Sequence, residues 1–186
     1  MTRDYGWAPS GKRLVANVPR NRGTVLTMIG ALTEDGVAAM MTNVGGASGE
    51  VWEAFVRDHL VPVLEPGDVV VLDNLGAHHR KSALALIEEA GAEPLFMPPY
   101  SPDLNPIELC WSKLKAILRP VGARTVTTLR AAIEDARNAI TRSDAAGWFK
   151  HCGYAVDGIP ERQQADGCGR GASRVLLAGA LSLAIG

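Results

Sequence analysis

Cysteine is scarce in this chain of 186 residues: Cys110, Cys152 and Cys168 are widely spaced and have no fourth partner. They form no paired motif of the kind that binds zinc, and their odd number argues against a framework of disulfide bonds. This cysteine usage fits a protein of the reducing cytoplasm.

A secretion signal and a long hydrophobic run are also lacking. The first residues are polar and include Arg3 and Asp4, which is unlike a signal peptide. The most apolar stretch, residues 175–185, is shorter than the roughly 20 residues that a membrane-spanning helix needs. We therefore expect no membrane partner.

The chain has little net charge, −1 at pH 7, but its charges are unevenly distributed. Residues 1–30 and residues 106–130 each carry a local charge of +4, while residues 31–72 contain seven acidic side chains and one arginine. Two basic regions around an acidic one suit a polyanion held near metal ions. Ordinary solvated surfaces explain the same pattern, and on charge alone we prefer that explanation.

The periodicity of apolar residues predicts an α/β domain over residues 1–154. A short strand is expected at residues 14–18, and an Asp-Gly turn joins strands 24–33 and 37–42 in a hairpin. The further expected elements are helix 52–63, strand 68–72, helix 81–90, strand 93–97, a helix from residue 106, and helices 126–140 and 143–151. Antiparallel strands followed by alternating helices and strands indicate a mixed sheet with helices packed on it.

Residues 155–186 differ in character from the rest of the chain. Residues 157–172 are rich in Gly, Gln, Arg and Asp and lack periodicity, which is typical of a disordered linker. The apolar end, residues 175–185, either packs against the domain or has no structural role. We expect the second, because chain termini are seldom ordered unless they dock.

Two acidic residues stand in positions that favour metal binding. Asp73 ends the apolar strand, where it either begins a turn or serves a function at the carboxyl end of the sheet. Glu108 lies in the first turn of a helix that Asn105 caps and Pro106 opens, so it either closes a capping box or binds a ligand. A strand end and a neighbouring helix start can bring two carboxylates together, as Mg²⁺ sites require.

Three polar residues nearby are candidates for supporting roles. His78 either contacts phosphate and positions water, or caps the helix that follows it. Asn74 and Asn105 either orient the carboxylates or serve as turn and cap residues, and the second explanation is the simpler one. Phe96, Met97 and Trp111 are expected in the core.

Two segments resemble the catalytic domain of bacterial mariner-like transposases of the insertion-sequence 630 family. They are Leu72-Asp73-Asn74-Leu75-Gly76-Ala77-His78 and Pro98-Pro99-Tyr100-Ser101-Pro102-Asp103-Leu104-Asn105-Pro106-Ile107-Glu108. The second string is long and specific. The 34 residues between Asp73 and Glu108 also match that family's spacing between its second and third catalytic acids. The resemblance extends from about residue 1 to residue 154.

The resemblance implies a ribonuclease-H-like fold and an Asp-Asp-Glu triad that binds two Mg²⁺ or Mn²⁺ ions, with Asp73 as the second acid and Glu108 as the third. It implies DNA cleavage at transposon ends and strand transfer to target DNA. The expected partners are DNA and another transposase chain or the product of an upstream reading frame, in the bacterial cytoplasm near the nucleoid. Candidate DNA contacts are Lys12, Arg13, Lys113, Lys115 and Arg119.

The sequence departs from the family at its first acid. In the family this aspartate lies on the first strand, which is central in the sheet. Asp4 falls past that position, and the hairpin turn explains Asp35. We therefore expect an N-terminally truncated domain that lacks this strand. Unpaired backbone groups and exposed apolar faces would make it marginally stable. The absence of the first catalytic aspartate would impair its activity. The alternative is a non-enzymatic remnant that inhibits by binding DNA or full-length transposase.

Overall fold

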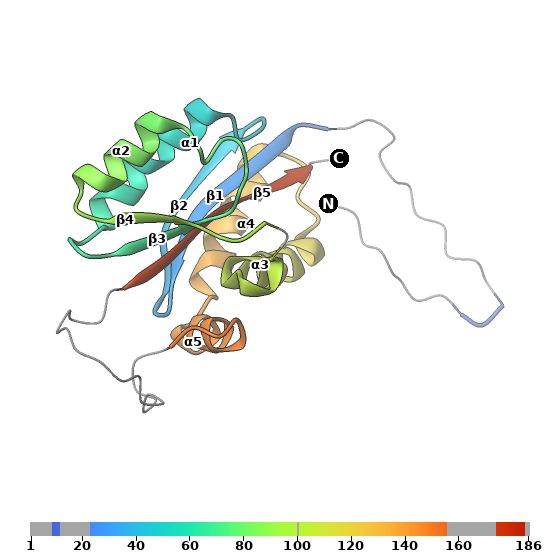
Figure 1. The fold of residues 1–186 in the computed structure, drawn as a ribbon. Helices are drawn as coiled ribbons and strands as arrows, with labels where there is room; N and C mark the ends of the chain where they lie inside the picture. Colours follow the sequence, from blue (N-terminus) through green and yellow to red (C-terminus); the bar gives the residue numbers. More distant parts are fainter. Residues whose placement is uncertain (1–8, 12–22, 100, 156–173, 185–186) are drawn as a thin grey trace.

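The computed structural model describes residues 9–11, 23–99, 101–155 and 174–184 (Figure 1). The strand expected at residues 14–18 and the candidate residues Asp4, Lys12 and Arg13 lie outside these ranges. In chain order the elements are β1 (Val25–Thr33), β2 (Gly36–Val44), α1 (Gly49–Phe55), a π-helical turn (Val56–Leu60), a 3-10 turn (Val61–Val63), β3 (Val69–Leu72), α2 (Lys81–Glu89), β4 (Glu93–Phe96), a 3-10 turn (Pro102–Leu104), α3 (Pro106–Val121), α4 (Val126–Asn138), α5 (Arg142–His151) and β5 (Val175–Ala184).

The strands form one mixed sheet in the order β2-β1-β5-β3-β4. β1 runs antiparallel to both β2 and β5, whereas β3 runs parallel to both β4 and β5. Helices α1 and α2 cover one face of the sheet, and α3, α4 and α5 cover the other (Figure 1). This architecture confirms the predicted mixed α/β sheet flanked by helices.

The C-terminal strand β5 lies in the centre of the sheet, between β1 and β3 (Figure 1). Its pairing with β1 runs from Val25 opposite Ala184 to Leu32 opposite Leu177. The prediction of a disordered tail over residues 155–186 is therefore wrong for residues 175–184, and the domain extends beyond the predicted limit at residue 154. The strand is ordered because its backbone is paired on both edges and its apolar side chains are buried on both faces.

The expected gap in the centre of the sheet is not found in the described part of the chain. β5 supplies hydrogen-bonding partners to both β1 and β3 and fills the place where a missing strand would have separated them. We expected marginal stability because the inner edges of the sheet would be unpaired. In the described residues β5 pairs with both inner edges, so this cause of instability does not apply.

Helix α3 approaches the sheet closely over a pair of glycines. Gly30 on β1 stands opposite Gly179 on β5. A Cβ atom at Gly30 would lie 3.0 Å from Cη2 of Trp111, and one at Gly179 would lie 3.3 Å from Cγ2 of Ile107. Larger residues at these positions would require Trp111 and Ile107 to shift, so the two glycines permit the close approach of α3 to the centre of the sheet.

An ion pair joins α3 to α5. Lys113 Nζ lies 2.5 Å from Oδ2 of Asp144, which also accepts hydrogen bonds from the backbone N–H and the hydroxyl of Thr141 at the start of α5. The bonds from Lys113 and Thr141 lower the pKa of Asp144 to about 2. Asp144 therefore fixes the position of α5 as well as capping it.

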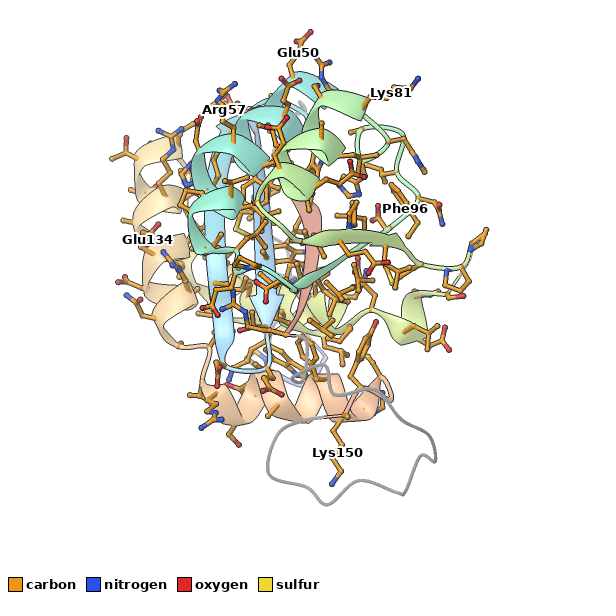
Figure 2. All side chains as sticks on the ribbon, turned by 60° about the vertical axis from the view of Figure 1, so that its left-hand side comes forward. Glu50, Arg57, Lys81, Phe96, Glu134 and Lys150 are labelled. Carbon is orange, nitrogen blue, oxygen red and sulfur yellow. The ribbon has the colours of Figure 1, made fainter. Side chains whose placement is uncertain are left out.

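The helix surfaces that face away from the sheet carry charged side chains. Figure 2 shows Glu50, Arg57 and Lys81 pointing outward from the layer of α1 and α2, and Lys150 pointing outward from α5. Among the described residues, no helix has the length and apolar character needed to cross a membrane.

Leu177→Ala should destabilise the protein by about 2–5 kcal/mol, because Leu177 is fully buried on the central strand and its truncation leaves a cavity. Leu75→Ala is the matched control, since Leu75 is 50 % exposed and its loss should cost less than about 0.5 kcal/mol. Urea unfolding followed by circular dichroism measures both values. Equal, small effects would contradict the central position of β5.

Asp144→Asn should lower the free energy of unfolding by about 1 kcal/mol at pH 7. A carboxyl whose pKa is depressed in the folded state stabilises above its unfolded pKa, so this contribution should disappear as the pH falls from about 4 to about 2. Urea unfolding across this range tests it, with Asp135→Asn at an exposed position of α4 as the control. A deficit that is independent of pH would refute the assignment.

Candidate metal-binding site

The carboxyl end of β3 and the first turn of α3 meet at a cavity of about 200 Å³. Asp73 directly follows β3, and Glu108 is the third residue of α3. Both predicted acids therefore border the same space. The cavity is lined by Asp73, Asn74, Met97, Pro98, Ser101, Pro102, Asn105 and Glu108.

The carboxylate of Asp73 is held through one of its two oxygens. Nδ1 of His78 lies 2.6 Å from Oδ1, and the backbone N–H of Leu75 donates to the same oxygen at 3.0 Å. The side chain is 34 % exposed. Because both contacts are made to Oδ1, Oδ2 is left for a ligand.

The surroundings of Asp73 favour its ionised form. Burial raises the pKa of Asp73, but the hydrogen bonds from His78 and Leu75, together with the charges of His78 and His79, outweigh burial and bring the pKa below its ordinary value. Asp73 is therefore a carboxylate at neutral pH, which is the form that binds a metal ion.

His78 is a buried partner of Asp73 and does not cap the helix that follows it. Its side chain is 1 % exposed, and its ring lies against Trp52 with the ring centroids 4.1 Å apart. A ring this deeply buried does not reach a phosphate, and Arg80 stands at the N-cap of α2 instead. His78 supports the site by orienting the Asp73 carboxylate, a role that its sequence position alone did not reveal.

Asn74 joins two strand ends. Its Nδ2 donates a hydrogen bond of 2.6 Å to the carbonyl oxygen of Met97, so the second residue after β3 is tied to the residue after β4. This bond fixes one wall of the cavity. Asn74 therefore has a structural role in the site, in addition to its place in the turn after Asp73.

Asn105 occupies the N-cap position of α3 but does not cap the helix with its side chain. Its backbone is extended (φ −112°, ψ 90°), and the side chain makes no capping hydrogen bond, so the predicted capping box with Glu108 is not formed. Asn105 is only 5 % exposed, and its Oδ1 has no hydrogen-bond partner among the described residues. A buried unpaired oxygen costs about 1–3 kcal/mol, and a capping bond to the start of α3 would avoid this cost.

Glu108 is consequently available to a ligand. It is exposed on the first turn of α3, where the backbone dipoles of the helix give a partial positive potential. Because the capping box is not formed, the position of Glu108 at the cavity favours the alternative that Glu108 binds a ligand.

Strand β5, which pairs with β3 beside Asp73, contributes no acidic side chain. Leu72 pairs with Ala178, so Gly179 stands next to Asp73, and Ile107 and Trp111 occupy the space over this glycine. Within residues 9–11, 23–99, 101–155 and 174–184, no three His, Cys, Asp or Glu side chains gather in a way that could hold a metal ion. The described residues thus provide two carboxylates rather than a triad.

The available donors fit one hard divalent cation. Mg²⁺ commonly takes one or two protein carboxylates and completes its coordination with water and phosphate oxygens. Asp73, Glu108 and the unpaired amide oxygen of Asn105 are donors of this kind. A site for two ions, as the sequence resemblance implies, would need a further carboxylate.

The candidate DNA contacts on α3 differ in their surroundings. Lys113 is engaged by Asp144 and holds α5 against α3. Lys115 and Arg119 follow on the same helix, four residues apart and therefore on one face. Contact with DNA remains a prediction for these residues.

Comparison with known families identifies the class of protein. Residues 1–130 match the family model described as DDE superfamily endonuclease. This match covers well over half of the chain, and the protein belongs to that superfamily.

Similar solved structures are complexes of the Mos1 transposase. The Mos1 strand transfer complex matches with a TM-score of 0.66 at 15 % identity, the paired-end complex with left transposon end with 0.66 at 16 %, and the pre-cleavage transpososome with 0.61 at 15 %. Each match covers 81 % of this chain and 47 % or 48 % of the other, so the chain spans about half the length of these proteins. The similarity confirms the predicted ribonuclease-H-like fold. No curated protein matches the chain.

His78→Leu should raise the pKa of Asp73, because the change removes the largest of the contacts that lower it and leaves the effect of burial. The pKa can be followed from the ¹³Cγ chemical shift of Asp73 during an NMR titration. His59→Leu is the control, since His59 stacks on Phe55 and should leave the Asp73 titration unchanged. An unaltered Asp73 pKa in a folded His78→Leu variant would contradict the assigned role.

Proposed function

We propose that this chain is a transposase catalytic domain of the insertion-sequence 630 family that binds Mg²⁺ or Mn²⁺ through Asp73 and Glu108. Its reaction is cleavage of phosphodiester bonds at transposon ends and strand transfer to target DNA. The observation that carries the proposal is that both acids of the sequence motif border one cavity. Membership of the DDE endonuclease superfamily and the fold shared with Mos1 transposase support it.

The residues of the site divide the work between them. A divalent ion, when bound, polarises the phosphoryl group and activates the attacking oxygen. Asp73 presents Oδ2 while His78 and Leu75 hold Oδ1. Glu108 reaches the cavity from the start of α3, a position that also favours the approach of a phosphate.

DNA and a second transposase chain are the partners that we infer. The similar Mos1 structures are described as a strand transfer complex, a paired-end complex with a transposon end and a transpososome. Lys115 and Arg119 lie on α3, the helix that begins at the cavity with Glu108, whereas Lys113 on the same helix is paired with Asp144. A cationic helix in this place would contact the phosphates that flank the scissile bond.

The number of carboxylates limits the activity that we expect. Two acids at the cavity suit binding of one ion, whereas the two-ion mechanism of phosphodiester cleavage needs ligands for a second. We therefore expect slow cleavage by the isolated chain. A chain that binds DNA but no divalent ion would instead be a non-enzymatic binder of DNA or of full-length transposase.

Asp73→Asn and Glu108→Gln should each weaken Mn²⁺ binding about tenfold or more, because each removes a charged ligand from the cavity. Isothermal titration of the full chain with Mn²⁺ measures this. Asp103→Asn is the matched control, since Asp103 is an exposed acid on the turn before α3 that does not line the cavity. Wild-type affinity in both site variants would refute the site.

Cleavage of transposon-end DNA in Mn²⁺ provides the functional test. Slow cleavage that disappears in Asp73→Asn supports the proposed reaction. Mn²⁺-independent binding of the same DNA, without any cleavage, would favour the non-enzymatic alternative.

A further inference from the structure

Asn105 is the residue of the cavity whose environment the proposed function leaves unexplained. It lines the cavity together with Asp73 and Glu108, and it is nine-tenths or more buried. Its Oδ1 has no hydrogen-bond partner among the described residues, although a capping bond to the start of α3 would be available to an asparagine at this position. Unpaired buried polar groups are rare in folded proteins and require a reason.

Two other buried polar atoms among the described residues lack a hydrogen-bond partner, but they do not lie at the cavity. Within the described chain, the indole N–H groups of Trp52 and Trp111 are also unpaired. Both are donors, which do not bind a cation, and neither residue lines the cavity. Asn105 is therefore the unpaired acceptor that borders the candidate site.

We propose that the side-chain oxygen of Asn105 is a third ligand to the divalent cation held by Asp73 and Glu108. This inference rests on the proposed metal site and adds a ligand to it. A carboxamide oxygen is a hard, neutral donor that Mg²⁺-like and Ca²⁺-like cations accept. The Asn105 side chain lines the cavity, and no capping bond holds its oxygen to the start of α3.

A neutral ligand suits this position better than a third acid would. Asp73 and Glu108 already bring two negative charges to one cavity. An amide oxygen adds to the coordination of the cation without adding repulsion between the ligands when the cation is absent. In this proposal the Asn105 oxygen stays unpaired in the metal-free protein because its partner is the cation.

Mn²⁺ titration of the full chain tests the proposal. Asn105→Ser should weaken Mn²⁺ binding about tenfold, because serine caps a helix well but its hydroxyl does not reach as far. Asn105→Asp, which keeps an oxygen at the same distance and adds charge, should bind Mn²⁺ at least as tightly as the wild type. Asn138→Ser is the control, because Asn138 lines a different cavity. A thermal melt without metal establishes that each variant is folded.

The outcomes separate this inference from the proposed function. Wild-type Mn²⁺ affinity in Asn105→Ser, with the affinity lost in Asp73→Asn, would overturn the role of Asn105 and leave the metal site standing. Equal weakening by Asn105→Asp and Asn105→Ser would also overturn it, because the amide would then act as a donor. No Mn²⁺ binding by the wild-type chain would overturn both.

Discussion

The pairing of β5 with β1 on one side and with β3 on the other is the constraint on which the rest of the structure depends. The hairpin of β1 and β2 and the parallel pair of β3 and β4 are hydrogen-bonded into one sheet through β5. Both helical layers pack on this continuous sheet, with Leu177 facing the core of α3 and Leu176 facing the core of α1 and α2. The position of Asp73 therefore depends on a strand more than 100 residues further along the chain.

Local pattern predicted the elements well but did not predict this long-range pairing. The hairpin, the buried strand before Asp73 and the helices each have a period or a turn signal in their own residues, and the structure contains them. The apolar run of β5 has the composition of a strand. The strands with which β5 pairs are determined by the gap between β1 and β3. The ten residues of β5 do not themselves specify that gap. The resemblance, which covers about residues 1–154, gave no information on it.

The site shows the same division between local and distant causes. The motif selected Asp73 and Glu108, and the fold brings the end of β3 and the start of α3 to one cavity although α2 and β4 separate them in the chain. The roles of His78 and Asn105 could not be inferred in this way. The ring of His78, in the turn before α2, lies against Trp52 of α1, and Asn105 departs from the capping geometry that its position favours. Sequence reasoning selected these residues, and the packing shows what each one contacts.

One glycine links the packing of the sheet to the composition of the site. Gly179 stands beside Asp73, on the face of the sheet that α3 covers, and Ile107 lies close enough to leave little room for a side chain. An acid at this position would be the neighbour best placed to join Asp73 and Glu108, but its Cβ would lie 3.3 Å from Cγ2 of Ile107, which would have to shift. The close packing of α3, which carries Glu108, thus disfavours a third carboxylate on β5. The described residues therefore bring two carboxylates, and not three, to the cavity.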